Sequence, residues 1–214
     1  MVNKIKALYS DKRLVIVCYI GFFVLSILAG VFSFAQDRLM RANGTLQQTT
    51  YTIQNFELYG LEEIQGETNA LISTNIDPRM IMLNAPERVH RVDIYVNFSM
   101  KPGEFNIFYM PQQGMEEFDP NYRQWAREEA ENHYSFAMPR KPLYGIRIDP
   151  GIYTGNEIRF AQIVLNQKMP ITSFFSISYT WLFYFALVPA MGASAIKYVI
   201  ALFTPKAPKK EVVK

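Results

Sequence analysis

Apolar residues gather in two long stretches near the ends of the chain, whereas the middle alternates apolar and polar positions. The first stretch, from Leu14 to Ala35, reads LVIVCYIGFFVLSILAGVFSFA and has no charged residue. At about 1.5 Å per residue, a helix of this length crosses the hydrocarbon layer of about 30 Å. It predicts a transmembrane helix over residues 14–35. A cleaved signal peptide is the alternative, but its apolar core is typically only about 7–15 residues long.

The second apolar stretch predicts another transmembrane helix, over residues 174–203. Pro189 and Lys197 interrupt it, and a proline kink and a lysine that reaches to the interface accommodate them. Neither stretch contains an acidic residue or a histidine. An ion or proton path built by this chain alone is therefore not expected.

Small residues recur at four-residue spacing in both stretches and are candidates for helix packing. They are Ser26 and Gly30 in the first stretch, and Ala186, Ala190 and Ser194 in the second. Such stripes let helix backbones approach each other or a partner closely. The alternative is that small residues are simply common in membrane helices.

Residues 36–170 follow a period of two, which is typical of strands. Val92, Ile94 and Val96 alternate with polar residues. A second run over residues 105–109 follows Lys101-Pro102-Gly103, so we expect a hairpin between the two runs. Further candidate strands are centred on Phe56, Ile72, Ile81, Phe136, Ile146 and Phe160. The pattern predicts a mainly β domain, an antiparallel β-sandwich or jelly roll, flanked by the two transmembrane helices.

One segment of this domain lacks the alternation. Asp119 and Pro120 suit the N-cap and first position of a helix, and good helix formers follow over residues 121–134. A short inserted helix is expected there. Its Tyr122, Trp125 and Arg127 are candidates for glycan binding or partner docking. Alternatively, an aromatic residue on an inserted helix holds that helix against the sheet.

Charge changes the picture that the average composition gives. The chain is 50% hydrophobic and 19% charged, with a net charge of +3, values typical of a soluble protein. However, residues 1–13 together with the end of the chain from Lys197 carry nine Lys and Arg against two acids, so these ends hold +7 and the middle −4. The positive-inside rule then places residues 1–13 and the basic tail 204–214 in the cytoplasm and residues 36–170 outside, across a plasma (inner) membrane. We expect contact with the lipid bilayer and no nucleic-acid partner.

Other classes are excluded by composition or lack their chemistry. The composition excludes disordered and collagen-like chains. A disulfide-rich chain is excluded because Cys18 is the single cysteine. That scarcity in an exported domain fits a bacterial protein. His90 and His133 lie far apart and no pair has zinc spacing, so neither a metal nor a cofactor is expected.

Acidic residues near the segment without alternation carry the enzymatic alternative. They are Glu116, Glu117, Asp119, Glu128, Glu129 and Glu131. Such a group could supply the two carboxylates of a glycan-modifying enzyme. Acids crowded on a loop or a helix surface are usually just solvated, so a non-catalytic protein is favoured.

The order of short motifs in the middle of the chain resembles a known kind of domain. Phe56-Glu57-Leu58 is followed by Thr74-Asn75-Ile76-Asp77-Pro78 before residues 80–83, and Ile146-Arg147-Ile148-Asp149-Pro150-Gly151 precedes the last strand, which ends at residues 163–165. Over about residues 52–166, this order resembles the jelly-roll, carbohydrate-binding-module-like domains that lie outside the membrane in bacterial polysaccharide-assembly proteins. Some of these proteins are multi-span glycosyltransferases.

The resemblance implies a role with cell-envelope glycans, and Arg147 and Asp149 join the candidates for glycan binding or docking. An Asp-Pro-Gly turn with a flanking arginine often just closes a strand end. Because this chain has only two spans, it would be an accessory subunit of polysaccharide assembly or export. Its partner would be a membrane-embedded glycosyltransferase or a polysaccharide exporter. A subunit of an oligomeric channel or receptor is a further alternative, and a homo-oligomer is compatible with the sequence.

Overall fold

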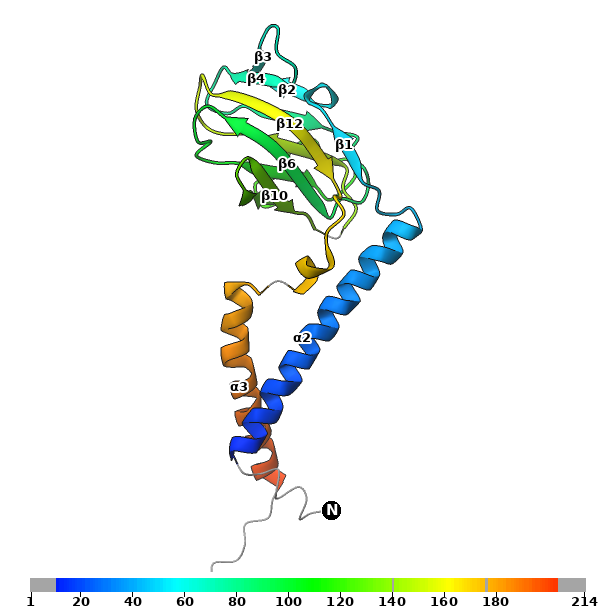
Figure 1. The fold of residues 1–214 in the computed structure, drawn as a ribbon, viewed down its shortest axis with the longest axis vertical. Coiled ribbons are helices and arrows are strands. Elements are labelled where there is room, and N and C mark those ends of the chain that lie inside the picture. The colour runs from blue at the N-terminus through cyan, green and yellow to red at the C-terminus, as the bar shows by residue number, and fades with distance from the viewer. Residues whose placement is uncertain (1–10, 140, 176, 204–214) are drawn as a thin grey trace, which may run out of the picture. The chain divides into compact units, whose positions relative to one another are not determined.

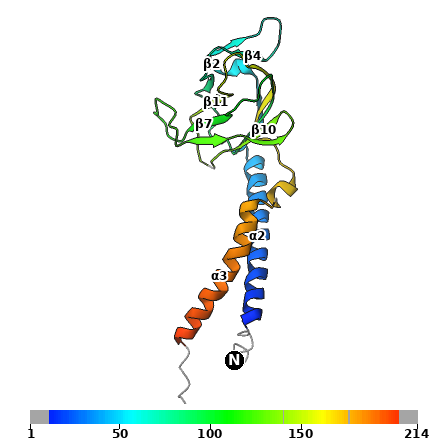
Figure 2. The ribbon, with the colours of Figure 1, turned by 90° about the vertical axis from the view of Figure 1, so that its left-hand side faces the viewer.

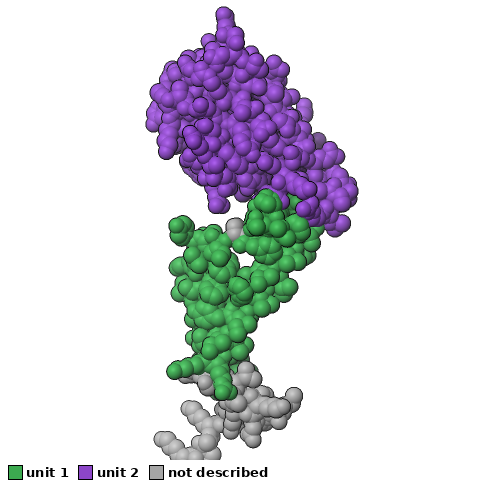
Figure 3. All heavy atoms as spheres, viewed as in Figure 1, with its two compact units in different colours: residues 1–37, 170–214 green, residues 38–169 purple. Residues whose placement is uncertain are grey.

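The computed structural model of the protein describes residues 11–139, 141–175 and 177–203 (Figure 1). The chain divides into two compact units (Figure 3). Residues 38–169 form the β unit, and residues up to 37 together with those from 170 onward form the helical unit.

The helical unit contains the two long helices, α2 (Asp11–Ala42) and α3 (Tyr179–Phe203). Both are long and apolar enough to cross a membrane. Helix α2 extends beyond the predicted span at both ends. Helix α3 starts later than residue 174. Ser178 is its N-cap, because the Ser178 hydroxyl accepts a hydrogen bond from the Trp181 amide at 3.1 Å. Ile171–Phe175 instead forms a short 3-10 helix, η2.

Aromatic side chains make the close contacts inside the helical unit. The Tyr19 hydroxyl donates to the Ala186 carbonyl at 2.8 Å. The Phe22 ring lies 6.4 Å from that of Trp181 and 6.0 Å from that of Phe185, measured between centroids. Such edge and tilted pairs are favourable geometries for aromatic rings.

The small residues of the predicted packing stripes have several surroundings. Gly30 faces η2, since a Cβ there would lie 2.7 Å from a ring carbon of Phe175. The Ser26 and Ser194 hydroxyls donate to carbonyls of their own helices, those of Phe22 and Ala190. Ala186 supplies the carbonyl that Tyr19 contacts. Gly30 is thus the stripe position where a side chain could not be added without a shift of its neighbours.

The β unit consists of two antiparallel sheets among its described residues (Figures 1 and 2). The seven-stranded sheet runs β3 (Leu61–Glu63), β4 (Ala70–Ser73), β12 (Glu157–Leu165), β6 (Arg91–Phe98), β10 (His133–Ala137) and β9 (Arg127–Ala130), with β1 (Thr49–Tyr51) also paired to β12. The five-stranded sheet runs β2 (Glu57–Tyr59), β5 (Arg79–Met82), β11 (Gly145–Asp149), β7 (Asn106–Met110) and β8 (Arg123–Trp125). A 3-10 turn, η1 (Ile53–Asn55), precedes β2.

The core lies between the two sheets and follows the predicted alternation. Val92, Ile94 and Val96 of β6 point inward, and the opposite sheet contributes Met80, Ile107 and Ile148, all fully buried. The antiparallel β-sandwich between two apolar helices is therefore confirmed. Strand pleating places alternate residues on opposite faces, so one face of each strand makes the core and the other is free to build surface sites.

The predicted hairpin around Lys101-Pro102-Gly103 is wrong. Strand β6 belongs to the seven-stranded sheet and β7 to the five-stranded sheet, so residues 99–105 cross between sheets instead of joining two paired strands. Both strands are buried along most of their length. Turn residues predict a reversal of the chain, but they do not decide whether the next strand pairs with the first or packs opposite it.

The predicted inserted helix is also wrong, because its residues form β8 and β9. Asp119 accepts hydrogen bonds from the Asn121 and Tyr122 amides and thus closes a turn rather than capping a helix. Asn132, with φ 59°, makes the turn into β10. Helix propensity differs by less than about 1 kcal/mol per residue among ordinary residues. Pairing of β8 with β7 and of β9 with β10 outweighs it.

A buried asparagine directly after β12 ties the chain entry and exit of the β unit together. The side chain of Asn166 accepts from the His90 amide at 2.8 Å and donates to the Gln47 and Arg88 carbonyls at 3.1 and 2.8 Å. Its own carbonyl accepts from the Arg41 guanidinium at 2.9 Å. Three segments that are distant in the sequence therefore meet on one side chain, which is 1% exposed.

Replacing this side chain tests its role. Asn166→Ala removes three hydrogen bonds, leaves buried backbone groups without partners and places alanine at φ 57°. We expect the free energy of unfolding to fall by about 2–4 kcal/mol. Asn166→Gly loses the same bonds without the backbone strain and should cost less. Denaturant titration of the full chain in detergent, followed by near-UV circular dichroism, measures this; an Asn166→Ala value equal to that of the exposed-strand control Asn97→Ala would contradict it.

Candidate functional site

A pocket of about 350 Å³ opens at one end of the β-sandwich. The loops that precede β7 and β12 and the connection from β8 to β9 surround it. Its lining residues are Lys101, Pro102, Gly103, Phe105, Trp125, Ala126, Glu128, Tyr134 and Tyr153. Below, this is called the end pocket. It lies at the opposite end of β6 and β12 from Asn166, where the chain enters and leaves the unit.

Two partly exposed aromatic rings line the end pocket, and two more anchor it to the core. Trp125 is 53% exposed and Tyr153 is 46% exposed. Phe105 is buried and packs edge-on against Tyr134 at 5.2 Å between centroids. The pocket therefore offers accessible aromatic surface above a floor that is continuous with the hydrophobic core.

A second buried asparagine, directly before β12, holds the two loops of the pocket together. The Asn156 carboxamide oxygen accepts from the Met100 amide at 2.9 Å and from the Ser99 hydroxyl at 3.1 Å, and its nitrogen donates to the Met100 carbonyl at 3.0 Å. The Ser73 hydroxyl donates to the Tyr153 carbonyl at 2.5 Å and accepts from the Asn156 amide at 2.9 Å. Lys101 and Tyr153 are thus carried on loops fixed by the same network.

Two Pro-Gly turns pack against each other at the rim of the pocket. Gly103 has φ 71° and Gly151 has φ 149°. A Cβ on Gly151 would lie 3.0 Å from the Pro102 carbonyl oxygen, and one on Gly103 would lie 3.1 Å from the Tyr153 ring. Both positions therefore require glycine for space as well as for backbone conformation. The Asp-Pro-Gly motif identified in the sequence shapes the pocket through Gly151.

The polar groups of the pocket are one ammonium, one carboxylate and two phenols. Within residues 11–139, 141–175 and 177–203, Lys101 and Glu128 form no ion pair. Burial raises the pKa of Tyr134, and the charge of Glu128, its cross-strand neighbour, raises it further. Tyr134 therefore remains a neutral hydrogen-bonding group at physiological pH.

Trp125 also belongs to a row of cations and rings on the outer face of the five-stranded sheet. The Arg123 guanidinium lies 4.3 Å from the Trp125 ring and 5.9 Å from that of Phe108. Arg147 covers Phe108 at 4.7 Å. Phe108 is only 8% exposed although it points away from the core, because these arginines cover it. Cation–π contacts of this kind orient the ring of Trp125 at the pocket rim.

Arg147 and Asp149 form an ion-pair network on the same face. Arg147 donates to Asp149 at 2.5 and 2.6 Å and to Asp77 at 3.3 Å, and Arg79 also pairs with Asp77. The hydrogen bond from Arg79 lowers the pKa of Asp77. Burial raises the pKa of Asp149 despite the opposing effect of Arg147. These side chains satisfy one another's charge and hydrogen-bonding capacity.

The structure separates the sequence-predicted candidates. Trp125 lines the end pocket, and Arg147 and Asp149 lie on the neighbouring sheet face. Tyr122 points to the core, 5.6 Å from the Tyr109 ring. The Arg127 side chain is 75% exposed and lies 3.7 Å from Glu129. Sequence reasoning missed Lys101, Phe105, Glu128, Tyr134 and Tyr153 as members of one site; the paired Pro-Gly turns were the available signal.

Two of the acids proposed for catalysis, Glu128 and Glu129, do not face the same site. Glu128 and Glu129 are adjacent on β9, so they point to opposite faces of the sheet. Glu128 faces the end pocket, whereas Glu129 accepts from the Ser135 hydroxyl at 2.8 Å and lies 3.6 Å from Arg91. Across the described residues, no group of three or more His, Cys, Asp and Glu could hold a metal ion.

His133 belongs to a separate polar cluster on the outer face of the seven-stranded sheet. Its Nε2 lies 2.8 Å from Asp93, which is fully buried and also accepts from Arg91. Its ring stacks on Tyr95 at 4.3 Å. Ser135 donates to Glu129 instead of to His133, so a Ser-His-Asp arrangement is not assembled there.

Comparison with known proteins shows a similarity in structure only. No protein-family model and no curated protein matches the sequence. The chain is similar to the low-affinity xylan-binding module CBM86 of Roseburia intestinalis, with 10% identity and a TM-score of 0.39, over 57% of this chain and 96% of the module. It is also similar to carbohydrate-binding module CBM6cm-2 of Cellvibrio mixtus lichenase 5A, solved with cellotriose, with 10% identity and a TM-score of 0.32, over 56% of this chain and 98% of the module.

A third similar structure is a family two carbohydrate esterase from Cellvibrio japonicus. The identity is 10% and the TM-score is 0.34, over 57% of this chain but only 34% of the esterase. Assignment of a function to this chain rests on the geometry of its own site.

Substitution of Gly103 tests whether the packed turns position Tyr153. Gly103→Ala adds a Cβ 3.0 Å from Ile152 and 3.1 Å from the Tyr153 ring at a positive φ. Gly66→Ala is the matched control, since Gly66 has φ 81° and open space around it. Both variants carry the backbone strain of about 1–2 kcal/mol, and Gly103→Ala should lose about 1 kcal/mol more through overpacking. Equal free energies of unfolding for the two variants would show that the turns do not hold Tyr153.

Proposed function

We propose that this chain is a membrane-anchored, non-catalytic protein that binds a carbohydrate in the end pocket. The observation that carries the proposal is the pairing of half-exposed Trp125 and Tyr153 with hydrogen-bonding groups in one concave site. A sugar ring has an apolar face of C–H groups and a rim of hydroxyls. Flat aromatic rings stack on the apolar face. Glu128, Lys101 and the phenols form hydrogen bonds with the hydroxyls.

Both charges of the site can be used by a sugar. Lys101 and Glu128 carry opposite charges and both remain available in the described residues. Sugar hydroxyls both donate and accept hydrogen bonds, so they complement an ammonium and a carboxylate at the same time. Fixed loops lower the entropy cost of ordering the site when the ligand binds.

The proposed setting is a bacterial inner membrane. Helices α2 and α3 are apolar enough to span it, and the charge difference of +7 at the ends against −4 in the middle favours cytoplasmic termini and an exterior domain over residues 36–170. With two candidate spans among the described residues, the chain would act as an accessory subunit of cell-envelope polysaccharide assembly or export. Its partner would be a membrane-embedded glycosyltransferase or exporter.

Loss of the exposed indole tests the carbohydrate site. The full chain, in a polyoxyethylene detergent that carries no sugar, is applied to an array of neutral, acidic and N-acetylated oligosaccharides. We expect it to retain at least one of these classes. Trp125→Ala should weaken that binding by at least about tenfold, which corresponds to about 1.4 kcal/mol of lost stacking.

Tyr59→Ala is the matched control, because Tyr59 is also 50% exposed but lies on β2, outside the end pocket. Its binding should stay within about twofold of the unchanged protein, since distant sites act independently. Equal retention of Trp125→Ala and the unchanged chain, or no retention of any class by the folded protein, would contradict the proposal.

A further inference from the structure

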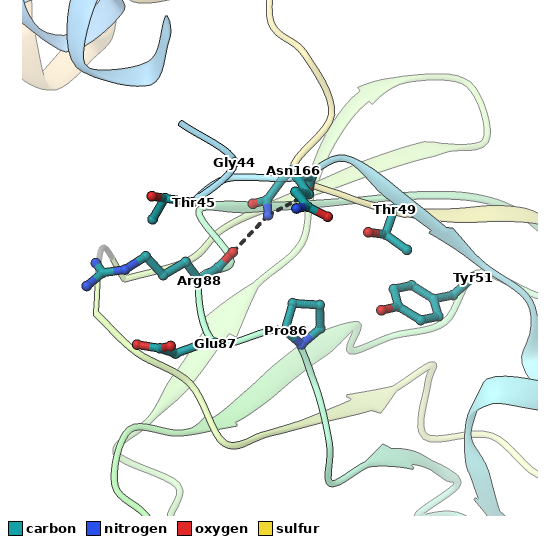
Figure 4. A pocket seen from close by; sticks show the side chains of 9 residues that line it. Gly44, Thr45, Thr49, Tyr51, Pro86, Glu87, Arg88 and Asn166 are labelled. Carbon is teal, nitrogen blue, oxygen red and sulfur yellow. Dashed lines mark hydrogen bonds between the residues drawn. The ribbon is translucent and has the colours of Figure 1, made fainter. Parts of the chain in front are cut away.

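A second pocket, of about 490 Å³, lies at the other end of the β-sandwich (Figure 4). The connection from α2 to β1, strand β1 itself and the loop from β5 to β6 line it, with Asn166 at its wall. Its lining residues are Gly44, Thr45, Gln47, Thr49, Tyr51, Pro86, Glu87, Arg88 and Asn166. Below, this is called the connector pocket. The proposed carbohydrate site does not use it.

The wall of the connector pocket is fixed, but several polar side chains around it are unused. Asn166 makes the three side-chain hydrogen bonds described above. Among the described residues, by contrast, the side chains at six lining positions make no hydrogen bond and no ion pair: Thr45, Gln47, Thr49, Tyr51, Glu87 and Arg88. A fixed wall beside side-chain donors and acceptors that have no partner in the described residues is suited to bind a polar ligand.

The two charges in the pocket come from neighbouring residues that do not pair with each other. Figure 4 shows the side chains of Glu87 and Arg88 extending to the same side of the pocket, away from Thr49 and Tyr51. A guanidinium is suited to a phosphate, which it can hold through two parallel hydrogen bonds. A carboxylate is suited to an ammonium group. The pair matches a ligand with a phosphate and an amine a short distance apart.

The connector pocket also lies close along the chain to the proposed membrane span. The apolar run ends at Ala35 and α2 continues to Ala42, so Gly44 follows about 10 Å of further helix. The headgroup layer extends roughly 5–8 Å beyond the hydrocarbon on each side. Along the chain, the first lining residue therefore comes directly after the segment of α2 that would cross the headgroup layer.

We propose that the connector pocket binds the headgroup of a zwitterionic phospholipid, with Arg88 on the phosphate and Glu87 on the amine. The Thr45 hydroxyl, on the same side of the pocket in Figure 4, would donate a further hydrogen bond to a phosphate oxygen. A sugar fits this pocket less well. The one aromatic residue that lines the pocket, Tyr51, packs partly against the core and so offers less ring surface for stacking. The inference rests on the proposed membrane span of α2 and is independent of carbohydrate binding.

Water-soluble headgroups test this without the background of lipid around the helices. The full chain in polyoxyethylene detergent, which has neither phosphate nor sugar, is titrated calorimetrically with glycerophosphoethanolamine, glycerophosphoglycerol and inorganic phosphate. We expect glycerophosphoethanolamine to bind most tightly. Phosphate binding as tight as that of glycerophosphoethanolamine would overturn the headgroup assignment and leave a simple anion site.

Two variants separate the two charges. Arg88→Ala should weaken the binding of glycerophosphoethanolamine by at least about tenfold, because a charge-assisted hydrogen-bonded pair is lost. Glu87→Gln should retain phosphate contact but reduce the preference over glycerophosphoglycerol to less than about twofold. Arg127→Ala, which removes an arginine that is 75% exposed outside the pocket, should leave all affinities unchanged.

The outcome is distinguishable from failure of the carbohydrate site. Trp125→Ala should bind glycerophosphoethanolamine as the unchanged chain does, and Arg88→Ala should still bind the oligosaccharide. Equal affinity of Arg88→Ala and the unchanged chain for glycerophosphoethanolamine would overturn the proposal, as would an absence of binding. Matching circular dichroism spectra for the variants exclude misfolding as the cause of a loss.

Discussion

Strand β12 is bracketed by two buried asparagines, and much of the β unit depends on them. Asn156 precedes the strand and Asn166 follows it, and each is 1% exposed. A buried carboxamide can donate and accept at once, so a single side chain satisfies backbone groups of several segments. Leaving such groups without partners would cost about 1–3 kcal/mol each. The two side chains therefore fix the loops at opposite ends of the sandwich.

The two ends have different chemistry although the same strand joins them. At the Asn156 end, packed Pro-Gly turns and the core aromatics present Trp125 and Tyr153 around the end pocket. At the Asn166 end, the connection to α2 surrounds a pocket lined by hydroxyls and two opposite charges. Aromatic rings suit the apolar face of a sugar, and paired charges suit an ionic headgroup. Both proposals follow from this division.

The sequence predicted the features that depend on local pattern. Long uncharged stretches predicted the two helices, and period-two alternation predicted strands such as β6 and β12 with Val92 and Ile94 inward. The sequence-based prediction failed where strand pairing determines the structure. The propensity of residues 121–134 for helix yielded to strand partners, and the turn at Gly103 joins two sheets instead of two paired strands. Among the residues that line the end pocket, the sequence singled out Trp125 as a binding candidate and Glu128 as one of several acids. It did not bring them together, because membership of a pocket depends on which loops meet.

The most direct test of the central claim uses Trp125 as its own reporter. The chain has two tryptophans, so Trp181→Phe leaves Trp125 as the sole one and keeps an aromatic ring beside Phe185 in the helical unit. Titration of this variant with an oligosaccharide that the unchanged chain retains should shift the indole emission to shorter wavelength and protect it from acrylamide quenching. Calorimetric saturation of the chain by the sugar with unchanged indole emission would show that the carbohydrate binds elsewhere.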